Sequence, residues 1–245
     1  MDAKSEVRVL SLFEAFADTG RPMSLSELAE RLGIPTSSCF NLVRAVEQRG
    51  YLYAARARGA LYPTRRLFDI AKAVFEHDAV SPAIRSRMAA LRDEVGETVC
   101  LAQRRDKEVV YLEVQESPQS IRFIVNVGDV RDLHSNSMGK AILSTMAKEA
   151  RERLLASLSY RRYTPRTLRS ASELEADIER GQERGWYGNS GESAPEALAC
   201  ALPVRVRSEW YGLAIVGPSQ RMEPKLKRHL TALRTAARDI SKESQ

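Results

Sequence analysis

Four polar residues with nucleic-acid chemistry recur at helical spacing near the start of the sequence. Ser37, Asn41, Arg44 and Gln48 follow one another at intervals of three or four residues, so in a helix they share one face. Asn and Arg suit the adenine and guanine edges that face the major groove of DNA. Ser38, near the start of the same helix, suits a phosphate oxygen. We therefore predict a face that reads DNA; the alternative is an ordinary solvated helix face.

A basic segment follows this helix directly. Two short apolar runs, 51–53 and 61–63, flank a small, basic stretch and predict a β-hairpin. Arg56 and Arg58 at its tip are placed to meet phosphates or an adjacent minor groove, unless the hairpin tip is only a solvated surface loop. Residues 41–66 include six arginines and a single acidic residue, a glutamate, so positive charge is concentrated in this segment.

Three short helices are expected to position these residues. An apolar stripe in residues 6–18 predicts the first. Ser24 precedes Glu27 by three residues, a capping-box pattern that begins the second helix, which Gly33 ends. The third is predicted over 36–48. Two short helices joined by a tight glycine-containing turn are typical of a helix-turn-helix, and the hairpin completes a winged form.

The rest of the chain predicts a larger α+β domain with a largely antiparallel sheet. We expect a DNA-binding domain over 1–65, a helical linker over 66–80 and a second domain over 81–245, beginning with a helix capped by Ser81 and Pro82. Period-two alternation predicts the strands, and apolar stripes predict the helices. The expected strands are 98–103, 108–114, 120–127, 198–206 and 210–216, and the expected helices are 139–146, 148–157, 172–184 and 224–242.

The chemistry of the second domain points to binding rather than catalysis. Residues 188–195 come near a nucleophile elbow but lack glycine at both required places. Gly139 and Lys140 are not part of a phosphate loop, because His134 and Ala141 stand where glycine and a hydroxyl residue are needed. The histidines and cysteines lie far apart in the sequence: His77, His134, His229, Cys39, Cys100 and Cys200. We therefore expect no metal site and no cofactor, and we expect the cysteines to be reduced, structural thiols. We also expect that the protein is not an enzyme.

Composition sets the broad class. The 245 residues are 43% hydrophobic and 29% charged, which is typical of a folded protein large enough for two domains. A net charge of +6 attracts polyanions without proving that one binds. The sequence has no apolar run of the roughly 20 residues that a membrane span needs, and no secretory leader is evident, so we expect a cytoplasmic protein without a membrane partner.

The sequence resembles the IclR family of bacterial transcription regulators over nearly its whole length. The N-terminal stretch from Ser24 to Leu52 resembles the family's winged helix, and the C-terminal half carries further blocks in family order. The resemblance implies a regulator that forms a homodimer or a dimer of dimers, and that changes its binding to double-stranded operator DNA when a small, often carboxylate-bearing molecule binds. The blocks are Gly128, Leu133-His134, Gly139-Lys140-Ala141-Ile142-Leu143, Tyr163-Thr164-Pro165-Arg166-Thr167-Leu168, Arg184-Gly185-Trp186, Ala201-Leu202-Pro203-Val204 and Val216-Gly217-Pro218.

The resemblance also implies where such an effector would bind. The family's effector positions fall here on seven residues: Phe123, Ser137, Met138, Asn189, Ala199, Ala214 and Val216. The last four replace Asp, Cys and two Ser of members that bind very small acids, which leaves the backbone N–H groups of Ser137 and Met138 to hold a carboxylate. We therefore expect an acid with an aromatic or bulky apolar body; the alternative is that the apolar residues pack beneath an equally small ligand.

Two other functions compete with a ligand-sensing regulator. A hydrolase with an appended DNA-binding module would need a nucleophile and a base, and no such pair is recognisable. A DNA-binding assembly protein, whose second domain only oligomerises, is the stronger alternative. It would be favoured if side chains filled the predicted ligand site.

Overall fold

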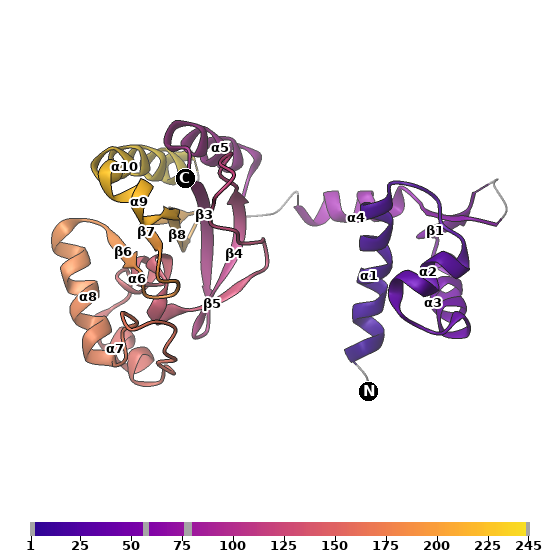
Figure 1. Ribbon diagram of the computed structural model, residues 1–245, viewed down its shortest axis with the longest axis horizontal. Helices are drawn as coiled ribbons and strands as arrows, with labels where there is room; N and C mark the ends of the chain where they lie inside the picture. Colours follow the sequence, from indigo (N-terminus) through magenta and orange to yellow (C-terminus); the bar gives the residue numbers. More distant parts are fainter. Residues whose placement is uncertain (1–2, 56–58, 76–79, 244–245) are drawn as a thin grey trace. The chain divides into compact units, whose positions relative to one another are not determined.

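The computed structural model describes residues 3–55, 59–75 and 80–243, which form two compact units, Met1–Asp78 and Ala79–Gln245 (Figure 1). The predicted fold class is confirmed: an N-terminal helix-turn-helix unit precedes an α+β unit with an antiparallel sheet. The segment expected as a helical linker contains α4 (Arg66–Phe75), which belongs to the first unit. No helix in the described ranges is long and apolar enough to cross a membrane.

The first unit packs three helices against a small hairpin. The helices are α1 (Ala3–Thr19), α2 (Leu25–Leu32) and α3 (Thr36–Gln48). Strands β1 (Leu52–Ala54) and β2 (Leu61–Pro63) pair antiparallel. One apolar cluster joins all of them, because Leu12, Leu28, Val43 and Leu52 meet in its centre. Burial of these side chains fixes the orientation of α3 and so determines which of its faces remains in solvent.

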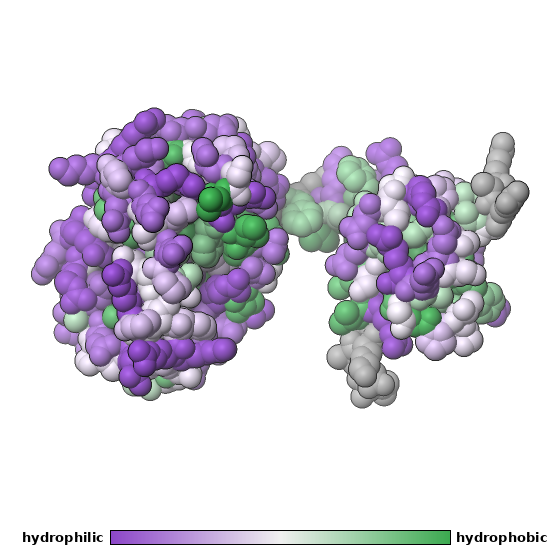
Figure 2. All heavy atoms as spheres, in the orientation of Figure 1, coloured by the Kyte–Doolittle hydropathy of each residue, from purple (hydrophilic) through white to green (hydrophobic). Residues whose placement is uncertain are grey.

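Apolar side chains also remain exposed on the first unit. On α4 none of the described side chains is fully buried, and its apolar residues colour the surface green in Figure 2. Phe68 is 58% exposed and Val74 is 65% exposed. On α1, Val7 and Leu10 are exposed to a similar extent, 59% and 65%. Such a concentration of exposed apolar surface is unusual for a protein that acts as a monomer.

The second unit is built on a six-stranded antiparallel sheet in the order β5-β4-β3-β8-β7-β6. Its central strands are long and almost wholly buried, as expected for strands covered on both faces. The strands are β3 (Thr98–Arg105), β4 (Glu108–Gln115), β5 (Val130–Asp132), β6 (Tyr187–Ser190), β7 (Ala197–Val206) and β8 (Glu209–Pro218).

Helices cover both faces of this sheet (Figure 1). On one face α5 (Pro82–Val95) and α10 (Leu226–Glu243) pack against the bulky side chains of the central strands, Leu101, Leu213 and Ile215 among them. On the other face lie α6 (Ser137–Leu143), α7 (Lys148–Ala156) and α8 (Ala171–Arg184). Short helical turns connect the main elements: η1 (Leu133–Ser135), α9 (Ser219–Met222) and η2 (Glu223–Lys225).

One expected strand is wrong. Residues 120–127 alternate in the sequence but form no strand; they belong to an irregular connection between β4 and β5. Phe123 and Val125 pack against the α6 face of the sheet, and the Phe123 carbonyl accepts a hydrogen bond from the Thr98 hydroxyl at 3.0 Å. The alternation therefore reflects a segment that lies across the face of the sheet, with Ile121 left 75% exposed.

Candidate functional site

The predicted reading face on α3 is exposed as one surface. Cys39, Val43 and Val46 are buried in the core of the first unit, so the opposite side of the helix faces solvent. Ser37, Asn41, Arg44 and Gln48 are all exposed, and Ser38 is half-buried beside them. In the described part of the chain Arg44 forms no ion pair, so its guanidinium is available to a partner.

The turn before α3 leaves the start of this helix open. Gly33 ends α2 with φ of 62°, a left-handed conformation that glycine adopts without strain. The predicted capping box is present: Ser24 accepts from the Glu27 N–H while the Glu27 carboxylate accepts from the Ser24 N–H. By contrast Pro35, which precedes α3, gives it no side-chain cap. The first-turn N–H groups of α3 therefore point outward as donors suited to a phosphate.

The wing is present where the sequence predicted it. Leu52 pairs with Pro63 and Ala54 with Leu61, and an isolated bridge from Met23 to Leu61 attaches the hairpin to the helices. Arg56 and Arg58, the predicted phosphate contacts of the wing, lie outside the described residues.

The seven residues predicted for an effector border one cavity in the second unit. They come from distant segments of the chain: the β4–β5 connection supplies Phe123, α6 begins with Ser137 and Met138, and strands β6, β7 and β8 supply the rest. Asn189 lies opposite Ala199 on the neighbouring strand, and Ala199 lies opposite Val216 on the next. The whole lining consists of Cys100, Tyr111, Phe123, Asn136, Ser137, Met138, Asn189, Ser193, Ala197, Ala199, Ala214 and Val216.

The cavity exists because small side chains point to this side of the sheet. Cys100, Ala199 and Ala214 occupy strand positions whose neighbours in sequence, such as Leu213 and Ile215, point to the opposite side. The cavity measures about 30 Å³. It borders an open groove of about 370 Å³, and Phe123 and Ala197 line both spaces.

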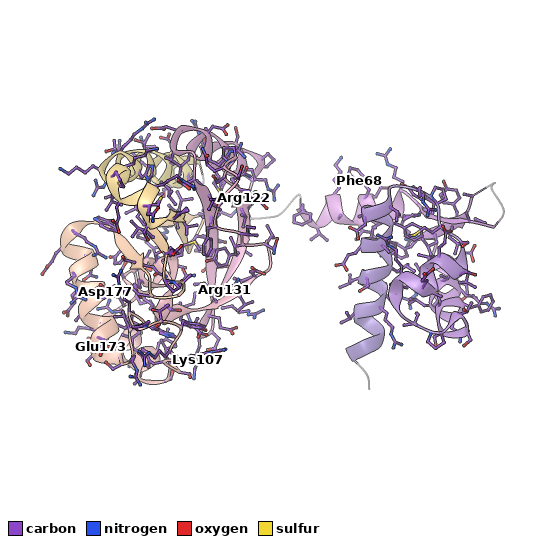
Figure 3. All side chains as sticks on the ribbon, in the orientation of Figure 1. Phe68, Lys107, Arg122, Arg131, Glu173 and Asp177 are labelled. Atoms are coloured by element: carbon purple, nitrogen blue, oxygen red, sulfur yellow. The ribbon has the colours of Figure 1, made fainter. Side chains whose placement is uncertain are left out.

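The groove is mostly apolar. It is lined by Ile121, Phe123, Pro195 and Pro218 together with short side chains. Among the described residues Arg122 is its one cation and Glu196 its one anion. Arg122 is labelled in Figure 3, and its Nε donates to Glu116 Oε2 at 3.0 Å, which ties down the start of the β4–β5 connection. Phe123 therefore borders both the small cavity, whose lining is mixed polar and apolar, and the larger apolar groove.

The start of α6 is only partly free to hold an anion. Asn136 caps this helix: its Oδ1 accepts from the Met138 N–H at 2.9 Å and from the Gly139 N–H at 3.3 Å. Of the two N–H groups expected to hold a carboxylate, that of Met138 is thus engaged by the Asn136 side chain, whereas that of Ser137 forms no hydrogen bond within the described residues. Asn189 is also committed to the protein, since its Nδ2 donates to the Ser135 carbonyl and to Ser193 Oγ.

A buried ion cluster lies next to the cavity. Lys140 is fully buried, and its Nζ lies 2.6 Å from Glu192 Oε1 and 2.7 Å from Asp177 Oδ2 (Asp177 is labelled on α8 in Figure 3). Burial raises the pKa of Glu192, although Lys140 opposes the shift. Burial would also raise the pKa of Asp177, but Lys140 and Arg180 lower it below its usual value. The Glu192 N–H donates to Asn189 Oδ1, so the cluster anchors the loop that follows β6.

Sequence reasoning missed five residues that line the cavity: Cys100, Tyr111, Asn136, Ser193 and Ala197. Asn136 carried a local signal, because an Asn before a short helical run is a typical N-cap. Tyr111 carried none, since only the pairing of β4 and the docking of α6 bring it to the cavity. Burial raises the pKa of the Cys100 thiol, which keeps it protonated and makes it a poor nucleophile.

The two units together define a class of protein: a winged helix-turn-helix that binds DNA, followed by an α+β unit with an internal cavity. Comparison with known families agrees. Residues 7–56 match the IclR helix-turn-helix domain, and residues 72–242 match the C-terminal domain of the bacterial transcriptional regulator IclR. The chain therefore belongs to the IclR family of bacterial transcription regulators.

Relatives support this assignment over the full length. The chain is 26% identical over 241 residues to the HTH-type transcriptional regulator KdgR of Escherichia coli, covering 97% of this chain and 91% of that protein. The fold matches the crystal structure of Thermotoga maritima IclR with a TM-score of 0.79 at 20% identity, covering 99% of both chains. It also matches an IclR homologue from Microbacterium hydrocarbonoxydans solved with 4-hydroxybenzoate, with a TM-score of 0.67 at 23% identity and coverage of 97% and 98%.

Proposed function

We propose that this regulator reads its operator with α3 and that a small organic acid with an apolar, aromatic body, bound in the cavity of the second unit, changes that DNA binding. One observation carries the ligand half of the proposal. Seven residues that the family resemblance implied as effector positions, scattered between positions 123 and 216, border the same cavity. The proposal rests on a cavity at the place where the family resemblance puts the effector.

The DNA-binding half assigns separate roles to bases and phosphates. Asn41 and Arg44 are exposed opposite the buried face of α3 and read base edges, with Ser37 and Gln48 beside them. Ser38 and the uncapped first turn of α3 contact a phosphate. Arg56 and Arg58 on the wing contact the backbone or the adjacent minor groove.

Alanine substitutions test these roles. Asn41→Ala and Arg44→Ala should each reduce the free energy of binding to the specific operator by about 1–3 kcal/mol and should relax discrimination between bases at the contacted position. Arg58→Ala should instead weaken binding to all DNA sequences to a similar extent. Arg31→Ala is a matched control, because Arg31 is exposed on α2, away from the reading face. Tight operator binding by the Asn41→Ala/Arg44→Ala double variant, measured by anisotropy, would contradict this orientation of α3.

For the ligand, we assign the acidic end to the cavity and the apolar body to the adjoining groove. The cavity, at about 30 Å³, has room for an acidic group but not for an aromatic ring. The adjoining groove is mostly apolar and about 370 Å³, and it shares Phe123 and Ala197 with the cavity, so the apolar body of the acid is assigned to the groove. The 4-hydroxybenzoate in the Microbacterium homologue makes that compound a natural first probe.

A thermal-unfolding screen tests this assignment. Ligands that bind the native state raise the unfolding temperature in a saturable manner. We expect benzoate and 4-hydroxybenzoate to raise it more than glyoxylate or pyruvate, and Phe123→Ala to change that preference. The best acid should also alter operator affinity. A preference for the smallest acids would overturn the proposal that the effector has an aromatic body. The absence of a shift with any acid would overturn the proposal that the effector is an acid.

The small size of the cavity favours one second candidate, a DNA-binding assembly protein that binds no ligand. The same screen separates the two, because only a ligand sensor responds to an added acid. In both cases we propose a homodimer, and a dimer of dimers at higher concentration, joined through the exposed apolar residues of α1 and α4. Phe68→Asp with Val74→Asp should shift the mass measured by light scattering toward that of a monomer.

A further inference from the structure

Tyr111 borders the cavity, and its hydroxyl group has one hydrogen-bond partner among the described residues. Tyr111 is 5% exposed and borders the cavity from β4. Asn136 Nδ2 lies 3.0 Å from its hydroxyl oxygen. The orientation of this amide is fixed, because Asn136 Oδ1 accepts from the N–H groups of Met138 and Gly139. An amide nitrogen only donates, so the Tyr111 oxygen is the acceptor and its own proton must point elsewhere.

No protein acceptor takes that proton. Tyr111 forms no second hydrogen bond with any residue that the structure describes. Burial raises the pKa of Tyr111 far above its ordinary value, so the phenol keeps its proton at physiological pH. A buried hydroxyl with an unpaired proton is costly unless a water or a ligand accepts it.

Ser193 has the same arrangement on the opposite edge of the sheet. Asn189 Oδ1 accepts from the Glu192 N–H at 2.9 Å, which fixes that amide too. Asn189 Nδ2 therefore donates to Ser193 Oγ at 3.0 Å, and the Ser193 proton is left over. The Ser137 hydroxyl, also on the lining, forms no hydrogen bond within the described residues. Tyr111 and Ser193 thus each accept one hydrogen bond from an asparagine amide and keep a proton to donate, and Ser137 adds a third hydroxyl to the lining.

The charge of the lining narrows the ligand group further. No lysine, arginine or histidine borders the cavity among the described residues, and the other side chains are apolar or, at Cys100, a protonated thiol. A ligand group that brings hydrogens of its own would meet donors on every polar side. A group with only lone pairs would satisfy them.

We propose that Tyr111 and Ser193 determine effector specificity by donating hydrogen bonds to a carboxylate, and that they reject the isosteric carboxamide. This inference rests on the proposed function, since it concerns the same cavity. It goes beyond the proposed function because it names two side chains that recognise the acidic end of the effector, and the sequence indicated neither of them. A carboxylate offers an acceptor oxygen to each of the two donors, whereas a carboxamide offers one oxygen and turns its NH2 group toward the other donor, which is then left unpaired.

Calorimetry with two probe pairs tests the inference: benzoate against benzamide, and pyruvate against pyruvamide. Wild-type protein should prefer the acid of at least one pair by at least about ten-fold. Tyr111→Phe should weaken binding of that acid about ten- to hundred-fold and should change binding of the amide little, so that the preference for the acid is lost. Ser193→Ala should act in the same direction. Tyr160→Phe is the matched control, because the Tyr160 hydroxyl donates to the Leu155 carbonyl at 2.9 Å and does not border the cavity.

The outcomes are distinguishable. If Tyr111→Phe weakened acid and amide equally, Tyr111 would act only by holding Asn136 and α6, and the donor role would be overturned. If wild type bound an acid and both variants retained its preference, the inference alone would fail. If wild type bound none of the four probes, the proposed acidic effector would fail and the inference with it.

Discussion

Replacing Lys140 with Met should destabilise the second unit more than any surface change. The Lys140 side chain is wholly buried, and its ammonium is the cation that faces both Glu192 and Asp177, whose side chains are only 11% and 14% exposed. Removing it leaves Glu192 in a poorly solvated site without its cation, and leaves Asp177 with only the exposed Arg180 as an ion-pair partner. Breaking a buried pair in this way costs about 3–5 kcal/mol. For a domain of this size that lowers the unfolding temperature by roughly 6–20 °C.

The assay is urea and thermal unfolding of the full chain, with Arg105→Met as the matched control. Arg105 pairs with Glu108 on the surface, where the side chains are 65% and 43% exposed, so its loss should cost less than about 1 kcal/mol. Adding Glu192→Gln to Lys140→Met should recover part of the lost stability, because one uncompensated charge disappears.

The pH dependence supplies a second readout. Without Lys140 the folded-state pKa of Glu192 should lie further above the unfolded value, because burial raises it and the opposing cation is gone, so the folded state takes up a proton more readily as the pH falls. The penalty of Lys140→Met should therefore shrink as the pH drops toward 4.5, the ordinary value for a glutamate. A penalty no larger than that of the control, or one strictly additive with Glu192→Gln, would refute the reasoning.

Three further predictions concern other parts of the chain. The Ser24 N–H and the Arg21 guanidinium lower the pKa of Glu27 from 4.5 to about 2, so its stabilising effect should persist above pH 4.5 and fade toward pH 2; the difference in unfolding temperature between wild type and Glu27→Gln should shrink over that interval. Gly212→Ala would place a Cβ 2.5 Å from Met138 Cβ, so it should cost about 1–3 kcal/mol in urea unfolding and alter ligand binding. The three buried cysteines should resist a thiol reagent until the protein unfolds; rapid labelling of native protein would contradict their burial.

Local signals predicted the first unit well. The capping box at Ser24, the turn at Gly33 and the apolar stripe of α3 are all contained within a few residues, and the structure has α3 over the predicted 36–48. The wrong strand at 120–127 shows the limit of such signals. The alternating apolar residues do not share one buried face, because Val125 is buried whereas Ile121 and Val127 are 75% and 62% exposed. Whether a segment pairs at the edge of a sheet or crosses its face depends on distant residues, here Thr98 and α6.

The sequence likewise predicted one part of the candidate ligand site and not the other. The positions taken from the family resemblance all reached the cavity, because the order of strands places Asn189, Ala199 and Val216 in one row. The hydrogen bonding within that cavity was beyond sequence reasoning. Which groups are free there depends on amide orientations at Asn136 and Asn189, and these are set by backbone N–H groups that only the folded chain brings near.

The sheet that carries the cavity is a single layer, so its two faces cannot move independently. On β8, Ala214 touches the cavity, while Leu213 and Ile215, one residue to either side, are packed under α5 and α10. Close-packed interiors transmit small displacements instead of absorbing them. A ligand that displaces Ala214 is therefore expected also to displace Leu213 and Ile215, and with them α10, which packs against both β8 and α5. Helix α5 is the first helix after the segment that joins this unit to the DNA-binding unit.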